Sequence, residues 1–487
     1  MITADQLGTA RPRRKVEKST AILGIVCISY FMVILDNSII FTGLPRIQAS
    51  LHFSPTGLAW VQDAYTLVFG GLLLLGARAG DIIGRRRAFN ISLVLFAGAS
   101  LLVGLAQAEW WIIAARAFQG VGAALLAPSS LALLTATFAE GKERSRAVAA
   151  YSAVAGIGAS AGLVVGGALA DLVSWRAGFF INVPIGLAML VASRRWLTSE
   201  PAVRGGRFDL VGALCATLGV GALVYATIHG AESGWGPTAI GTLILGGVLI
   251  VGLIVNEAKV ADPIMPLRLF TDRVRTGAYV TRLLYLAAMI GFFFFTTQYL
   301  QGVLGYSPLT AGLAFMPMTI VNFAVAVVIG RIIRRFGSNT TLVAGVTLTL
   351  IGMAWLSRIG AGSDYLTAVG FPMLLIGAGQ GLAFAPMTSA GLNGVAGADA
   401  GASSGVINTF QQMGSALGLG VLTLIGAAAV PSHSSAVEAL VKRVGAALTG
   451  GSGLLLVCLV VVLVLVVRRS PPQRTESKAA QAESATI

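Results

Sequence analysis

The sequence has 487 residues, of which 56% are hydrophobic and only 11% are charged. Soluble domains carry roughly 25% charged residues, so this composition excludes an ordinary soluble fold and indicates a membrane protein. The net charge of +14 is also typical of nucleic-acid binders. However, the basic residues lie in short clusters between long apolar runs, as charge that sets membrane topology does. We therefore expect a lipid bilayer, and no nucleic acid, as partner.

Fourteen runs in chain order are long and apolar enough to cross a bilayer, which takes about 20 residues each. They lie at 20–45, 57–76, 88–107, 110–134, 146–169, 177–196, 209–229, 236–256, 277–302, 308–330, 339–357, 366–391, 403–428 and 446–467. The predicted fold class is an all-α polytopic membrane protein.

Basic residues mark one side of this topology. Cytoplasmic connections carry an excess of lysine and arginine. The rich segments are the stretch from Arg11 to Lys18, the connections around Arg85, Lys142, Arg194, Lys259 and Arg334, and the stretch after Arg468. These segments alternate with poorly charged ones along all fourteen runs. The pattern predicts a multi-pass plasma-membrane protein, in bacteria the cytoplasmic membrane, with both termini cytoplasmic.

Three short segments recur in the same order at nearly one offset. Residues 77–84 resemble 330–337, Gln119-Gly120 recurs as Gln380-Gly381, and 158–163 resembles 414–419. The repeat predicts two six-helix halves around an extra pair of helices, with a substrate site between the halves. The predicted units are a tail at 1–19, a half at 20–200, extra helices 7 and 8 at 201–275, a half at 276–467 and a tail at 468–487.

Five segments carry a resemblance to a known family. They are 35–45, 76–87, 116–124, 175–186 and 266–270. In order and spacing they resemble motifs of the major facilitator superfamily and, within it, the fourteen-helix drug:proton antiporters. The sequence departs from these motifs at Ala77, where glycine is usual, and at Leu163, where proline is usual.

The resemblance covers nearly the whole chain and implies alternating-access export of small amphipathic compounds by proton antiport. Such proteins need no cofactor, and we expect the chain to work as a monomer. The sequence shows no P-loop, catalytic motif or metal-ligand cluster, so we expect neither an enzyme nor a metal site. Two alternatives stay open, a proton-coupled importer of a small organic solute and a non-transporting membrane sensor.

Ionisable residues within spans are costly and are functional hypotheses by default. Asp36, Asp63 and Arg116 lie at similar depth, about 9–12 Å below the outer surface at 1.5 Å per residue. We predict that the two acids take up protons and that Arg116 tunes them, although a static ion pair would also fit. Arg282 lies near the inner end of its span, where we expect its side chain to extend to the membrane surface.

Two motifs suggest moving parts. By the resemblance, Asp81, Gly84, Arg85 and Arg86 form an inner gate. Gly158, Gly162 and Gly166 recur every four residues on one helix face, next to Gly167, which permits close helix contact.

Candidate cavity residues are the polar and aromatic side chains within spans. They are Asn37, Gln62, Gln119, Phe292, Phe295, Gln298, Asn322, Gln411 and Gln412. Few acids lie in the spans, which disfavours dications and favours neutral or monocationic substrates.

Overall fold

The computed structural model describes residues 10–138, 141–197, 209–260, 263–395, 399–431 and 433–467, apart from the side chains of a few helical residues. Every regular element in these ranges is a helix, as the apolar runs predicted. In a bilayer, a helix satisfies all of its backbone hydrogen bonds within itself.

The first half contains seven helices. They are α1 (Ala10–Leu51), α2 (Ala59–Ile83), α3 (Arg85–Gly104), α4 (Glu109–Thr137), α5 (Lys142–Leu172), α6 (Ala177–Phe180) and α7 (Asn182–Trp196). α6 and α7 follow each other within one apolar stretch, Ala177–Trp196. An extra pair follows, α8 (Leu210–Ser233) and α9 (Pro237–Lys259).

The second half begins after a short connector. Its elements are η1 (Leu267–Phe270), α10 (Arg273–Gly302), α11 (Pro308–Ala314), α12 (Met316–Phe336), α13 (Ser338–Leu356), η2 (Leu366–Gly370), α14 (Phe371–Gly391), α15 (Ala400–Ala428), α16 (Ala436–Val461) and η4 (Val462–Val467). The last helix begins at Ala436, earlier than the predicted 446, because its first turns are amphipathic and carry Glu438 and Lys442.

Thirteen helical stretches of the described residues are long and apolar enough to cross a membrane. α5 supplies a shorter apolar stretch, Ile157–Leu172. Together they make the fourteen predicted runs. Large apolar side chains such as Val248 of α9 and Val327 of α12 are exposed on the outside of the bundle, as a lipid-facing surface requires.

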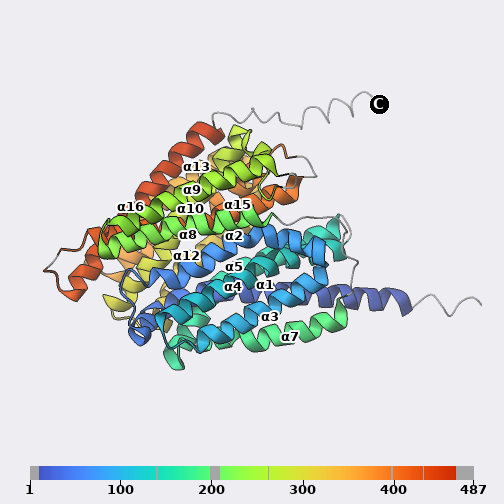
Figure 1. Ribbon diagram of the computed structural model, residues 1–487, viewed down its shortest axis with the longest axis horizontal. Helices are drawn as coiled ribbons and strands as arrows, with labels where there is room; N and C mark the ends of the chain where they lie inside the picture. The colour runs from blue at the N-terminus through green and yellow to red at the C-terminus, as the bar shows by residue number, and fades with distance from the viewer. Residues whose placement is uncertain are drawn as a thin grey trace, which may run out of the picture.

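The two halves meet along two equivalent helix pairs. α2 packs along α15, and α5 packs on α11. In each pair, the second span of one half meets the fifth span of the other, which is the relation that a pseudo-twofold repeat produces. In Figure 1 the helices of the first half lie mostly below those of the second half, and the axes of the long helices are roughly aligned.

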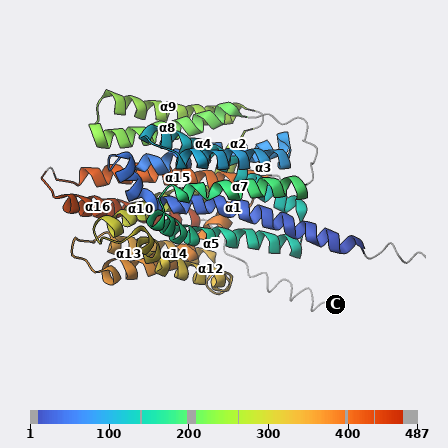
Figure 2. The ribbon, with the colours of Figure 1, turned by 90° about the horizontal axis from the view of Figure 1, so that it is seen from below.

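The extra pair covers one side of this junction. α8 packs on both α2 and α15. Figure 2 shows α8 and α9 at one edge of the bundle and α12, α13 and α14 at the opposite edge. The contact with α2 is close, since a Cβ at Gly71 would overlap the Thr217 side chain of α8.

Candidate functional site

A cavity of about 640 Å³ lies between the halves. It reaches from Asn37, in the middle of α1, to Arg78 and Thr135, near the ends of α2 and α4. Its walls carry four aromatic side chains, Tyr30, Tyr65, Phe69 and Tyr151. The polar part of the opposite wall comes from α15 and consists of Ser404, Asn408, Gln411 and Gln412.

The halves are in contact beyond the other end of this cavity. Phe41 of α1 stacks on Phe293 of α10 with ring centroids 5.5 Å apart. Gln301 Nε2 donates to the Thr42 carbonyl at 2.9 Å. The cavity therefore extends toward the end of the bundle at which α1 begins, and contacts between α1 and α10 close the other end.

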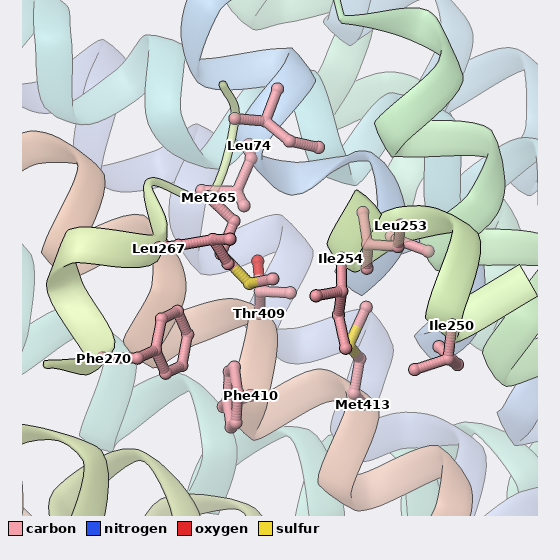
Figure 3. Close-up of a pocket in the computed structure, with 13 residues that line it drawn as sticks. Leu74, Ile250, Leu253, Ile254, Met265, Leu267, Phe270, Thr409, Phe410 and Met413 are labelled. Carbon is pink, nitrogen blue, oxygen red and sulfur yellow. The ribbon is translucent and has the colours of Figure 1, made fainter. Parts of the chain in front are cut away.

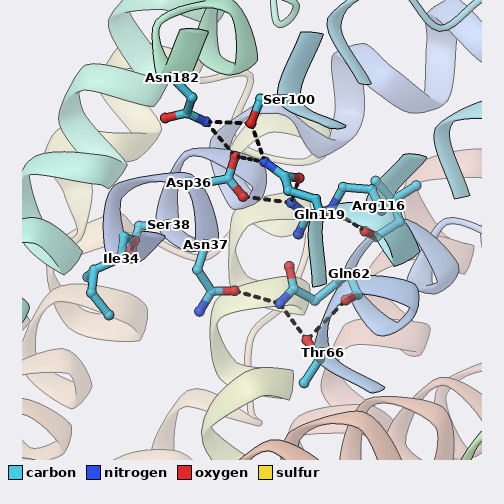
Figure 4. A network of polar contacts seen from close by, with 11 residues as sticks. Ile34, Asp36, Asn37, Ser38, Gln62, Thr66, Ser100, Arg116, Gln119 and Asn182 are labelled. Atoms are coloured by element: carbon cyan, nitrogen blue, oxygen red, sulfur yellow. Dashed lines mark hydrogen bonds and ion pairs between the residues drawn. The ribbon is translucent and has the colours of Figure 1, made fainter. Parts of the chain in front are cut away.

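A fully buried ion pair lies behind the first-half wall. Arg116 Nη1 donates to Asp36 Oδ2 at 2.7 Å, and both side chains have no exposed surface. Arg116 Nε also donates to the Val61 carbonyl of α2 at 3.0 Å, and Nη1 donates to Gln119 Oε1 at 2.8 Å. The pair thus joins α1, α2 and α4 (Figure 4).

Two amides hold the other carboxylate oxygen. Asp36 Oδ1 accepts from Gln119 Nε2 at 2.7 Å and from Asn182 Nδ2 at 2.8 Å. The Ser100 hydroxyl accepts from the same two amides. Sequence reasoning had placed Gln119 in the cavity, but the amide belongs to this network. It missed Ser100 entirely, and Asn182 had appeared only within the segment 175–186.

Tyr65 separates the ion pair from the cavity. Its ring lines the cavity, while the Arg116 guanidinium lies 4.3 Å from the ring centroid. Beside it, Gln62 Nε2 donates to Asn37 Oδ1 at 2.9 Å, so Gln62 supports a cavity residue. Any group bound against Tyr65 or Asn37 is therefore one side chain away from the Asp36 network.

Asp63 is not part of this network. Its side chain is completely buried, and neither carboxylate oxygen has a hydrogen-bond partner among the described residues. It lies two turns before Gly70, a position where an added Cβ would be 2.6 Å from Gln412 Cβ of α15. The spacing of seven places Asp63 on the same face of α2, at the seam with α15.

The equivalent position in the second half is neutral. Gly158 packs on Ile34 of α1, and its repeat partner Gly414 packs on Leu283 of α10. This alignment places Tyr285 where the first half has Asp36. Tyr285 is hydrogen-bonded to Thr349 at 2.8 Å. Within the described spans, the carboxylate network therefore belongs to one half.

The predicted glycine face packs on the helix that carries Asp36. A Cβ at Gly162 would lie 2.5 Å from Ser38 Cβ, and one at Gly166 would lie 2.6 Å from Ile39 Cα. Gly167 faces the other way, and a Cβ added there would overlap the Pro308 carbonyl of α11. These four glycines thus serve both the α1–α5 contact and the junction between the halves.

The gate motif is described in part. The Asp81 side chain lies outside the described residues. Gly84 joins α2 to α3 with φ +92°, a conformation that favours glycine. Arg86 Nη2 donates to the Arg194 carbonyl of α7 at 3.0 Å, and Arg85 begins α3.

The remaining cavity candidates lie in different places. Phe292 and Phe295 are buried inside the second half and line neither described cavity, because neighbouring helices cover α10 on several sides. Gln298 donates to the Phe294 carbonyl of its own helix. Asn322 lies half-buried on α12. Only Asn37, Gln411 and Gln412 of the nine candidates line the cavity.

Arg282 does not extend to the membrane surface, which corrects our expectation. Only 7% of it is exposed. Its Nε and Nη2 donate to Gln411 Oε1 at 3.1 and 2.7 Å. The guanidinium lies 4.1 Å from the Phe384 ring centroid. Stacking on an aromatic face inside the bundle replaces the hydration that a surface position would give.

A second cavity adjoins the first and is almost wholly apolar. Its volume is about 320 Å³, and Figure 3 shows α9 residues Ile250, Leu253 and Ile254 facing Phe410 and Met413 of α15. Leu74 and Ile264 line both cavities. Within the described ranges, no group of three or more His, Cys, Asp or Glu side chains is placed to hold a metal ion.

Comparisons with known proteins agree with this architecture. A family model described as Major Facilitator Superfamily matches residues 26–419. The cephamycin export protein CmcT of Amycolatopsis lactamdurans is 39% identical over 86% of this chain and 87% of its own. The puromycin resistance protein pur8 of Streptomyces alboniger is 38% identical over 84% and 82%.

The fold is also that of a solved transporter. A structure reported in a study of substrate recognition in proton dependent oligopeptide transporters aligns with a TM-score of 0.65. The alignment covers 93% of this chain and 100% of that one at 15% identity. At this identity the likeness shows the fold alone.

Proposed function

Because the chain belongs to the major facilitator superfamily, we propose that it exports small amphipathic compounds in exchange for protons. The similarity to proteins named for cephamycin export and puromycin resistance supports export of antibiotic-like compounds. The aromatic and amide walls of the central cavity suit a substrate that has both apolar and polar parts.

The single observation that carries the coupling is the position of Tyr65. Tyr65 lines the cavity, and the guanidinium of Arg116 lies 4.3 Å from its ring centroid. A substrate that presses on Tyr65 therefore changes the space available to Arg116. Arg116 in turn is paired with Asp36. Substrate binding against Tyr65 therefore influences, through Arg116, whether Asp36 binds a proton.

The chemistry of the pair makes a proton the natural ligand. Two charges removed from water are stable only while they stay paired and hydrogen-bonded. If Arg116 moves, Asp36 loses its strongest partner, and a proton on Asp36 removes the resulting unpaired charge. Proton uptake and movement of α4 against α1 are then linked, which biases the equilibrium between two arrangements of the halves.

Asp63 supplies a second proton position on the outer side. In this structure Asp63 is completely buried on the face of α2 whose Gly70 meets α15 at the seam between the halves, and no described group pairs with it. Opening that seam would bring water to Asp63. An unpaired charge there is costly, so a proton from the outside, or a cationic group of a substrate, is the partner that this site lacks.

Inverted membrane vesicles test this function. They are energised by respiration, and uptake of a panel of fluorescent amphiphiles into the lumen is recorded. We expect uptake that stops on addition of a protonophore and continues when ATP is depleted. Movement only in the opposite direction would favour an importer, and uptake insensitive to the protonophore would contradict proton coupling.

A further inference from the structure

Arg282 is a buried cation without an acidic partner in its own half. Between Arg273 and Ala428, the described spans contain no aspartate or glutamate. Among the described residues, its Nη1 has no hydrogen-bond partner, and Nε and Nη2 donate only to a neutral amide. A buried arginine is costly unless its charge is compensated, so the site lacks an anion.

Gln411 connects this cation to the cavity. Arginine is a donor only, so the amide oxygen of Gln411 must face Arg282, as the two hydrogen bonds show. The amide nitrogen Nε2 of Gln411 therefore points away from Arg282, and it makes no hydrogen bond to any described residue. Because Gln411 lines the cavity, Arg282 fixes an N–H donor at the cavity wall and places a positive charge behind it.

The rest of the cavity has the same electrostatic character. None of the described residues that line it is acidic, whereas Arg78 is basic. Tyr30 of the opposite half also lines it. Tyr30 and Gln411 thus line the same cavity from the two halves.

We infer that Arg282 and Gln411 form a recognition site for the carboxylate of an amphiphilic acid, whose apolar body lies against Tyr30, Tyr65 and Phe69. The carboxylate accepts from the Gln411 amide and supplies the counter-charge that Arg282 lacks. This inference rests on the proposed export function and refines its substrate class. It adds amphiphilic acids to the neutral or monocationic compounds that the sequence favours.

A matched pair of probes tests the site. The probes are 6-(2-naphthyl)hexanoic acid and its methyl ester, which differ in the charge of one end. Binding to the purified full-length protein is measured at about pH 7.5, where a carboxylic acid is ionised. We expect wild type to bind the acid at least about tenfold more tightly than the ester, since an ion pair in a water-poor site favours the anion.

The variants separate the site from general effects. Arg282→Gln and, independently, Gln411→Leu should reduce the preference for the acid to about twofold or less, with ester binding retained. Arg331→Gln, which removes an exposed arginine of α12, should keep the full preference. Gln411→Leu keeps the inference testable if Arg282→Gln fails to fold.

Equal binding of acid and ester by wild type would overturn the inference, and so would a preference that survives in both variants. No binding of the acid at all would also overturn it. Export of the ester by vesicles is measured in parallel. If the ester is exported while the acid preference is missing, the proposed function stands without this site, whereas loss of all export counts against the function itself.

Discussion

The backbone of Gly162 in α5 lies against Ser38 of α1, so closely that a Cβ at position 162 would be 2.5 Å from Ser38 Cβ. Ser38 is two residues from Asp36, so the glycine contact holds the helix segment that carries the buried acid. Movement of α5 against α1 is therefore coupled to the position of Asp36.

Replacing this glycine should impair transport. Gly162→Ala forces α1 away from α5, and overpacking of this kind costs about 1–3 kcal/mol. We expect a lower Tm and an export rate reduced at least about tenfold, because a 1.4 kcal/mol penalty on a required state already corresponds to tenfold. The control is Gly98→Ala in α3, where an added Cβ meets nothing within 4 Å. Equal rates in both variants would contradict the close-contact role.

The buried pair predicts a partial rescue. Arg116→Met leaves Asp36 without its cation and should lower the free energy of unfolding by about 3–5 kcal/mol. Adding Asp36→Asn removes the orphaned charge and should restore part of this loss. Neither variant should exchange protons. Thermal unfolding in detergent checks the stability, and a double variant less stable than Arg116→Met would refute the pairing.

Tyr65 offers a test of the link between cavity and ion pair. Its hydroxyl has no partner among the described residues, whereas its ring covers Arg116. Tyr65→Phe should therefore keep substrate-dependent proton release. Tyr65→Leu removes the aromatic face, worth about 2 kcal/mol when desolvated, and should reduce proton release per substrate bound. The number of protons released per substrate bound is measured in proteoliposomes for both variants. Equal values in Tyr65→Phe and Tyr65→Leu would show that the ring does not transmit the effect.

An exposed ion pair predicts a pH dependence. Arg268 of η1 donates to Asp399 with Nε–Oδ2 and Nη2–Oδ1 distances of 3.0 and 2.7 Å. These hydrogen bonds from Arg268 lower the pKa of the Asp399 carboxyl below its ordinary value. The contribution to stability is present above the unfolded-state pKa of about 3.9 and is lost as pH falls through the lower, folded-state pKa.

The comparison of wild type with Asp399→Asn measures this effect. We expect a small Tm difference near neutral pH, because surface pairs contribute little, and no difference in strong acid. A Tm difference that grows on acidification would contradict the assigned pairing.

Much of the fold could be predicted from the sequence, because span length and the arginine distribution are set by the bilayer itself. The Asp36–Arg116 pair followed from equal depth in neighbouring spans. Ser100 gave no signal, since a serine within a span usually bonds to its own helix. The inward turn of Arg282 was also missed, because it depends on Phe384 and Gln411, which are distant in sequence.

Depth in the membrane alone could not predict whether Asp36 and Asp63 belong to the same hydrogen-bond network. Both lie toward the end of the bundle where α1 ends and α2 begins, but they occupy faces that meet different neighbours. Asp36 faces α4 and α7 through Arg116 and Asn182. Asp63 shares the face of Gly70, which meets α15. The helical period of 3.6 shows which residues share a face, but not which neighbouring helix that face meets. The rotation of α1 and α2 about their axes therefore separates the two acids.

The role of Asp36 in proton coupling is tested most directly by the internal pH of energised inverted vesicles after substrate is added. Wild type should release protons from the lumen in proportion to the substrate taken up. Asp36→Asn should bind the same substrate in detergent but release none. Undiminished, substrate-dependent proton release by Asp36→Asn would contradict the claim that this buried carboxyl group couples protons to export.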